Sequence, residues 1–227
     1  MVPCERSARN AVIFRDRTDA GERLAAVLAP WRGSRPLVLA IPRGAVPMGA
    51  IVAERLDGEL DVVLTRKLAA PRNEEFAIGA VDESGWTYIA PYAASSGATP
   101  EYIQHEVAAQ LETMRNRRVQ YTPARPPLDP VGRVAIVIDD GLATGATMIT
   151  ALHAVASKHP QRLICAVPVA TADALDKVRP NCDEIVCLES EHDFFAISQC
   201  YGRFPQVDDR EVVSVLRASA QRAGTAT

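Results

Sequence analysis

Residues 135–147 read AIVIDDGLATGAT, and this stretch decides the fold. Its apolar residues run directly into Asp139 and Asp140, which a buried strand tolerates only if it ends there at a polar site. Ligands of open α/β sheets bind in the crevice at the carboxyl ends of the strands. The stretch therefore predicts a buried strand with two acids at the edge where a ligand binds.

The residues after the acids suit a phosphate. They are small or carry a hydroxyl, so the backbone can bend closely around an anion at a helix N-terminus: Ala143, Thr144, Gly145, Ala146 and Thr147. Carboxylates repel phosphate but accept hydrogen bonds from a vicinal diol. We therefore predict that Asp139 and Asp140 hold the hydroxyls of a ribose and that the loop holds its 5′-phosphate. The alternative is an acidic turn that caps an ordinary helix.

Strand and helix patterns alternate along most of the chain. Short apolar runs occupy 37–41, 61–65, 134–138, 162–169 and 184–188, and helical patterns occupy 16–29, 46–56, 99–119, 146–158 and 173–178. The alternation predicts an α/β fold, an open and mainly parallel sheet of about five strands flanked by helices. We expect a single domain over residues 1–227. Residues 66–98 break the pattern and predict a hairpin with extended runs at 77–81 and 86–89.

The composition argues against several classes of partner. The 25 basic and 28 acidic residues give a net charge of −3, which offers no bulk reason to expect nucleic acid or an anionic membrane surface. No apolar stretch approaches the roughly 20 residues of a membrane span. Five cysteines are odd in number and sparse, which favours a reducing cytoplasm, and four scattered histidines predict no structural metal site.

The run VIDDGLATGAT, residues 137–147, resembles the phosphoribosyl-pyrophosphate-binding signature of type I phosphoribosyltransferases. The resemblance extends over the whole chain and implies transfer of ribose 5-phosphate from phosphoribosyl pyrophosphate to a nitrogenous acceptor, with release of pyrophosphate. It also implies a homodimer, and Mg²⁺ as cofactor. The Mg²⁺ would be bound mainly through the substrate, with Asp139 and Asp140 reaching it through water and no direct protein ligand.

The same resemblance assigns residues to pyrophosphate. The family binds pyrophosphate at a turn after the first core strand, often with a non-proline cis peptide, and the turn at 41–44 occupies that place. Arg43 and Gly44 are therefore assigned to pyrophosphate, the alternative being an exposed turn with a solvated arginine. Arg66 and Lys67 directly follow the second predicted strand, so we expect both cations to emerge at the same sheet edge as the acids and the loop. There they would be catalytic by neutralising pyrophosphate as it leaves.

Two further segments resemble parts of the family that surround the reaction. Residues 66–98 are similar to its flexible loop, whose closure would bring in a charged run: Arg72, Asn73, Glu74 and Glu75. A solvated surface explains this run equally well. Residues 189–207 are similar to its acceptor-binding hood, with Phe195 and Tyr201 as candidates for stacking on a base. The alternative is that these rings pack the tail onto the sheet.

One position departs from part of the family. Members that act on 6-oxopurines carry an aspartate directly before the Thr-Gly of the loop, and Ala143 stands there, which points away from hypoxanthine and guanine. The acceptor stays unidentified. Two other functions stay open: a regulator that senses phosphoribosyl pyrophosphate without transfer, and a hydrolase or phosphorylase of a related ribose phosphate. Arg43, Arg66 and Lys67 favour catalysis, and the only basic cluster for a nucleic-acid surface is at 115–118.

Overall fold

The computed structural model describes residues 13–122, 127–191 and 196–225. A parallel sheet in the order β2-β1-β6-β7-β8 forms its centre, which confirms the predicted α/β fold. The strands of this sheet are β1 (Leu37–Ala40), β2 (Glu59–Val62), β6 (Val134–Ile138), β7 (Arg162–Thr171) and β8 (Glu184–Glu191).

Both faces of the central sheet are covered, which explains its continuous apolar strands. Every residue of β1 and β6 is buried. Along β6, Ile136 and Ile138 face one core cluster while Ala135 and Val137 face the other, because successive side chains of a strand point to opposite faces. Helices on the first side are α1 (Arg17–Val27), α2 (Val46–Arg55) and α6 (Asp209–Thr225), and those on the second are α4 (Ala146–Ala156) and α5 (Ala172–Val178).

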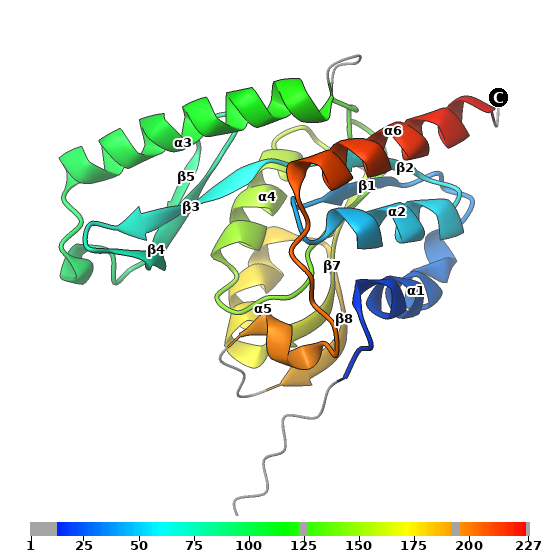
Figure 1. Ribbon diagram of the computed structural model, residues 1–227, viewed down its shortest axis with the longest axis horizontal. Helices are drawn as coiled ribbons and strands as arrows, with labels where there is room; N and C mark the ends of the chain where they lie inside the picture. Colours follow the sequence, from blue (N-terminus) through cyan, green and yellow to red (C-terminus); the bar gives the residue numbers. More distant parts are fainter. Residues whose placement is uncertain (1–12, 123–126, 192–195, 226–227) are drawn as a thin grey trace, which may run out of the picture.

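A second, antiparallel sheet projects from one side of the core. It comprises β3 (Thr65–Ala70), β4 (Asn73–Asp82) and β5 (Thr87–Ile89), and α3 (Pro100–Tyr121) lies along it (Figure 1). We call this sheet together with α3 the arm. The predicted runs at 77–81 and 86–89 belong to β4 and β5. The expectation of one strand over 61–65 was wrong, because β2 ends at Val62 and Thr65 begins β3.

Contacts with α4 hold the arm against the core. Trp86 stacks on His153 with ring centroids 3.6 Å apart and an angle of 10° between the ring planes. Asp82 is fully buried, and its Oδ1 accepts hydrogen bonds from the backbone N–H groups of Ser84 and Trp86. Its Oδ2 lies 3.8 Å from Nδ1 of His153. The arm thus contacts His153 of α4 both through the ring of Trp86 and through the carboxylate of Asp82.

Two long helices, α1 and α3, begin where a polar side chain accepts a backbone N–H of the first turn. Asp16 caps α1 by accepting from the backbone N–H of Asp19, and Thr99 caps α3 by accepting from that of Tyr102. No helix among the described residues is long and apolar enough to cross a bilayer. Short 3-10 turns complete the described elements: η1 (Ala29–Trp31), η2 (Ala94–Ser96), η3 (Arg179–Asn181) and η4 (Ile197–Cys200).

Met114 fastens α3 to the core and gives a test of this packing. Its side chain is 1% exposed, whereas Val119 on the same helix is 70% exposed. Met114→Ala should lower the free energy of unfolding by about 2–4 kcal/mol, because it leaves a cavity in the core. Val119→Ala should change it by less than about 0.5 kcal/mol. Urea unfolding measures both, and equal effects would contradict the placement of α3.

Candidate functional site

The turn after β1 and the acids after β6 lie at the same edge of the central sheet. The two strands are parallel neighbours, with Ala40 paired to Ile138, and the backbone N–H of Ile41 donates to the carbonyl of Ile138 at 2.9 Å. Gly44 approaches Asp140 so closely that a Cβ at this position would overlap the Oδ2 atom of Asp140. Two segments almost a hundred residues apart in sequence therefore meet at one point.

The acidic pair is half-buried and its two carboxylates have different surroundings. Oδ1 of Asp139 accepts the backbone N–H of Asp140 at 2.8 Å, while Arg17 donates to Oδ2 of Asp140 through Nη2 at 2.8 Å and Nε at 3.1 Å. Burial, and then the negative charge of Asp140, raise the pKa of Asp139 well above its usual range. Burial also raises the pKa of Asp140, but Arg17 opposes this rise.

Hydrogen bonds to β7 hold the start of the loop after the acids, and the end of the loop leads into the N-terminus of α4. The backbone N–H of Leu142 donates to the carbonyl of Val169 at 2.9 Å, and Oγ1 of Thr171 donates to the carbonyl of Ala143 at 3.0 Å. Gly145 has a φ of 79° and precedes α4, and no side chain among the described residues caps this helix. The first N–H groups of α4 are thus suited to an anion. Thr144 is exposed and Thr147 half-buried.

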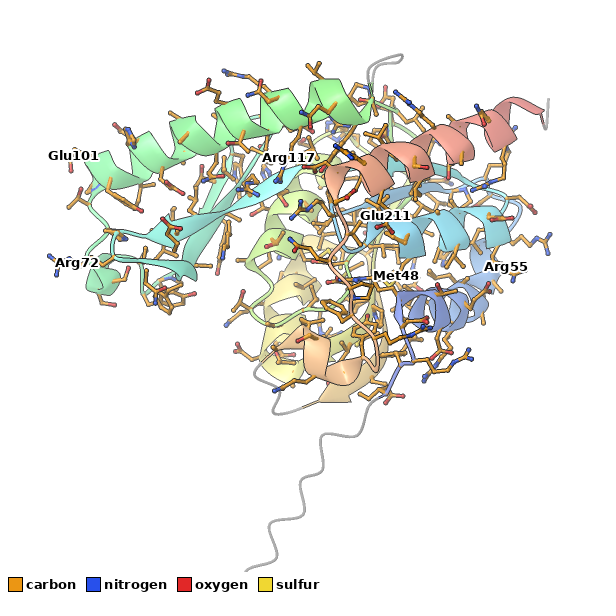
Figure 2. All side chains as sticks on the ribbon, in the orientation of Figure 1. Met48, Arg55, Arg72, Glu101, Arg117 and Glu211 are labelled. Carbon is orange, nitrogen blue, oxygen red and sulfur yellow. The ribbon has the colours of Figure 1, made fainter. Side chains whose placement is uncertain are left out.

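Positive charge gathers beside this edge. The Pro42–Arg43 peptide bond is cis. Arg66 in β3 donates from Nε to Oε1 of Gln110 in α3 at 2.8 Å. Burial lowers the pKa of Arg66, and the nearby charges of Arg117 and Arg43 lower it further. Arg117, which belongs to the basic cluster at 115–118, lies on the side of α3 that faces the core (Figure 2).

Asp209 at the start of α6 supports Arg43. Its Oδ2 lies 3.8 Å from Nη1 of Arg43, and its Oδ1 accepts a hydrogen bond from the hydroxyl of Tyr121. Burial and the charge of Asp209 raise the pKa of Tyr121, which keeps this hydroxyl protonated as a donor. The C-terminal helix therefore helps to place the turn after β1.

Other predicted residues lie apart from this group. Lys67 is exposed on β3, next to Arg66, and adjacent residues of a strand point to opposite faces of the sheet. Arg66 and Lys67 therefore lie on opposite faces of β3, and the catalytic role assigned to both stays a prediction. Arg72 lies at the far tip of the arm, at the start of the charged run 72–75 (Figure 2).

Tyr201 is packed inside the protein, so the interpretation of its ring as a platform for an acceptor was wrong. It is 5% exposed, its ring contacts Phe14 and Phe204 with centroids 5.4 and 4.8 Å apart, and its hydroxyl donates to the carbonyl of Asp140 at 2.7 Å. Phe195 lies outside the described residues. A cavity of about 300 Å³ opens beside the acids and is lined by Arg17, Arg43, Gly44, Asp140, Phe204, Pro205, Gln206 and Val207.

The fold and this edge define an α/β protein with a candidate ligand site at the carboxyl ends of parallel strands. The family model described as phosphoribosyl transferase domain matches residues 16–202, and the chain belongs to this family. Two Mycobacterium tuberculosis proteins, from strains CDC 1551 and H37Rv, each carry the name "putative phosphoribosyl transferase" and are 35% identical over 208 residues. These matches cover 90% of this chain but 46% of either relative, so the chain spans about half their length.

A solved structure shows the same fold. The crystal structure of TT1426 from Thermus thermophilus is 43% identical to this chain, with a TM-score of 0.76. The match covers 91% of this chain and 98% of that one. The likeness therefore extends from the central sheet to most of the remaining chain.

The raised pKa of Asp139 predicts that its charged form lowers the stability of the folded protein at neutral pH. Because the folded state raises the pKa of Asp139, stability falls as pH rises from the usual aspartate range towards that raised pKa. Asp139→Asn should therefore raise Tm at pH 8 by about 2–4 °C, the effect of about 1 kcal/mol in a domain of this size. The gain should shrink as pH falls towards 4.

Asp173→Asn is the matched control for this stability test. Asp173 is an exposed acid of α5, with a side chain 72% accessible. Its replacement should leave Tm nearly unchanged at both pH values. Thermal unfolding followed by circular dichroism measures the three proteins. An Asp139→Asn variant with an unchanged or lower Tm at pH 8 would contradict the electrostatic account of the pair.

Proposed function

We propose that this protein is a phosphoribosyltransferase that moves ribose 5-phosphate from phosphoribosyl pyrophosphate to a nitrogenous acceptor and releases pyrophosphate. The observation that carries the proposal is the contact of Gly44 with Asp140. It brings the candidate pyrophosphate turn directly against the candidate ribose carboxylate. A donor whose pyrophosphate is attached to a ribose carbon needs these two groups side by side.

Each part of the edge has a role in the proposed reaction. The carboxylates of Asp139 and Asp140 accept hydrogen bonds from the 2′- and 3′-hydroxyls, and the loop 143–147 surrounds the 5′-phosphate with N–H groups and hydroxyls. Arg43, Gly44 and Arg66 hold the pyrophosphate. The C1–oxygen bond to pyrophosphate breaks while a bond from the acceptor nitrogen to C1 forms. Catalysis is then mainly positional and electrostatic.

Mg²⁺ is the proposed cofactor, and the donor set fits it. Mg²⁺ prefers oxygen ligands and commonly uses one or two carboxylates together with waters and substrate phosphates. Asp139 and Asp140 provide two half-buried carboxylates next to the proposed pyrophosphate position. When bound, the ion neutralises charge on the leaving pyrophosphate. The acids would reach it through water.

The proposal is less specific about the acceptor, the oligomeric state and the cellular compartment than about the donor. Ala143 in the loop argues against a 6-oxopurine, and Tyr201 is committed to packing. Phe195, which lies outside the described residues, stays the candidate for stacking on an acceptor. We retain a homodimer, from the resemblance to the family, and the cytoplasm, which the sparse cysteines favour.

Calorimetry with phosphoribosyl pyrophosphate and Mg²⁺ tests the proposed donor. The wild-type protein should bind, and Asp139→Asn and Asp140→Asn should each weaken binding by about 10- to 100-fold, because a hydrogen bond to a charged group is lost. Asp173→Asn should bind as the wild type does. Chelation of Mg²⁺ should weaken binding of every variant that binds. Absence of wild-type binding, or binding unchanged in both acid variants, would refute the proposed donor site.

A screen for pyrophosphate release then tests transfer. The wild-type protein is incubated with phosphoribosyl pyrophosphate, Mg²⁺ and individual nucleobases and other nitrogenous compounds. Release that depends on one acceptor supports transferase activity and names the acceptor. Release without any acceptor would instead indicate a hydrolase. Binding without release would indicate a regulator.

A further inference from the structure

Arg17 is a buried arginine at the first turn of α1 with a direct contact to the candidate site. Its side chain is 10% exposed. Nη2 and Nε both donate to Oδ2 of Asp140, at 2.8 and 3.1 Å, while Nη1 donates to the carbonyl of Pro205 at 2.6 Å. The guanidinium lies over the ring of Phe204, 3.6 Å from its centroid. Arg17 thus connects α1 with Asp140 and with the segment at Phe204 and Pro205.

These contacts restrict the Asp140 carboxylate from several directions. Arg17 donates hydrogen bonds to Oδ2 from one side. On another side the backbone of Gly44 lies so close that a Cβ at this position would overlap Oδ2. The hydroxyl of Tyr201 donates to the backbone carbonyl of the same residue at 2.7 Å. Among the described residues, the charged and titratable groups that interact with Asp140 include Asp139 on the same edge, Arg17 from α1 and Tyr201, which follows η4.

Arg23 shows what a purely structural arginine on the same helix looks like. Its guanidinium also lies over an aromatic ring, that of Phe14, 4.6 Å from the centroid, and it donates to the carbonyl of Ile13 at 3.0 Å. Its acidic neighbour is the exposed Glu189 at 3.5 Å, and its own side chain is 42% exposed. Arg17 has the same two kinds of structural contact but adds the two-nitrogen grip on Asp140.

We propose that Arg17 is a positioning residue for ribose recognition, which fixes the Asp140 carboxylate in the orientation that accepts the ribose hydroxyls. This inference rests on the proposed function. Two hydrogen bonds from Arg17 to Oδ2 fix the orientation of the Asp140 carboxylate, and with it the position of Oδ1. The side chain of Asp140 therefore loses less rotational freedom when ribose binds. In this role Arg17 acts through Asp140 rather than through a contact of its own with the sugar.

Ligand fragments distinguish this role from a general effect on the fold. Ribose 5-phosphate with Mg²⁺ probes the acids and the loop, whereas inorganic pyrophosphate with Mg²⁺ probes the turn at Arg43. In calorimetry, Arg17→Gln should weaken ribose 5-phosphate binding by about tenfold and leave pyrophosphate binding within about threefold of wild type. Arg23→Gln should leave both within about twofold.

Two further variants sharpen the test. Arg17→Lys keeps the charge but loses the planar two-nitrogen grip, so it should recover part of the ribose 5-phosphate affinity. If Arg17→Gln does not fold, the Arg17→Lys variant alone is compared with the wild type. In the Asp140→Asn background, Arg17→Gln should cause less than about a threefold further loss, because two residues that act through one contact are not additive.

Several results would overturn the inference. Equal losses for ribose 5-phosphate and pyrophosphate, full additivity with Asp140→Asn, or a loss in Arg23→Gln as large as that in Arg17→Gln would each assign Arg17 to the fold alone. Wild-type protein that binds neither fragment nor phosphoribosyl pyrophosphate would refute the proposed function together with this inference. Wild-type binding with any of the first three results would refute the inference only.

Discussion

Two carboxylates at the end of a fully buried strand are the constraint on which the site depends. β6 is buried along its length, and Asp139 and Asp140 follow it directly. Such charges need partners when they leave water. A backbone N–H serves Asp139, and Arg17 serves Asp140. The acids in turn restrict what lies next to them, since a Cβ at position 44 would overlap Oδ2 of Asp140.

The strand and the loop were predictable because their signals are local. The run into Asp139 and Asp140, followed by small residues and hydroxyls, specifies a strand end and a helix start within thirteen residues. Alternating strand and helix patterns predicted the parallel sheet, and adjacency of β1 and β6 then brings Gly44 to the acids. The family resemblance assigned Arg43 and Gly44 to pyrophosphate, whereas the strand order that places them beside the acids comes from the structure.

Other features depend on contacts that no local pattern reports. Arg17 lies 123 residues from Asp140, and within a predicted helix it looks like one more surface charge. β3 carries the charged pair Arg66 and Lys67 and has few β-branched residues, so it reads as loop until β4 pairs with it. Tyr201 looked available because sequence shows an aromatic ring but not the neighbours that bury it.

The account connects stability with the proposed chemistry, because the acids that it predicts to lower the stability of the free protein are those that would accept hydrogen bonds from ribose. A crystal structure with phosphoribosyl pyrophosphate and Mg²⁺ tests this account most directly. We predict the 5′-phosphate in the loop 143–147, the ribose hydroxyls on Asp139 and Asp140, and the pyrophosphate at Arg43 and Gly44. Ligand density elsewhere, or a sugar turned away from the two acids, would contradict it.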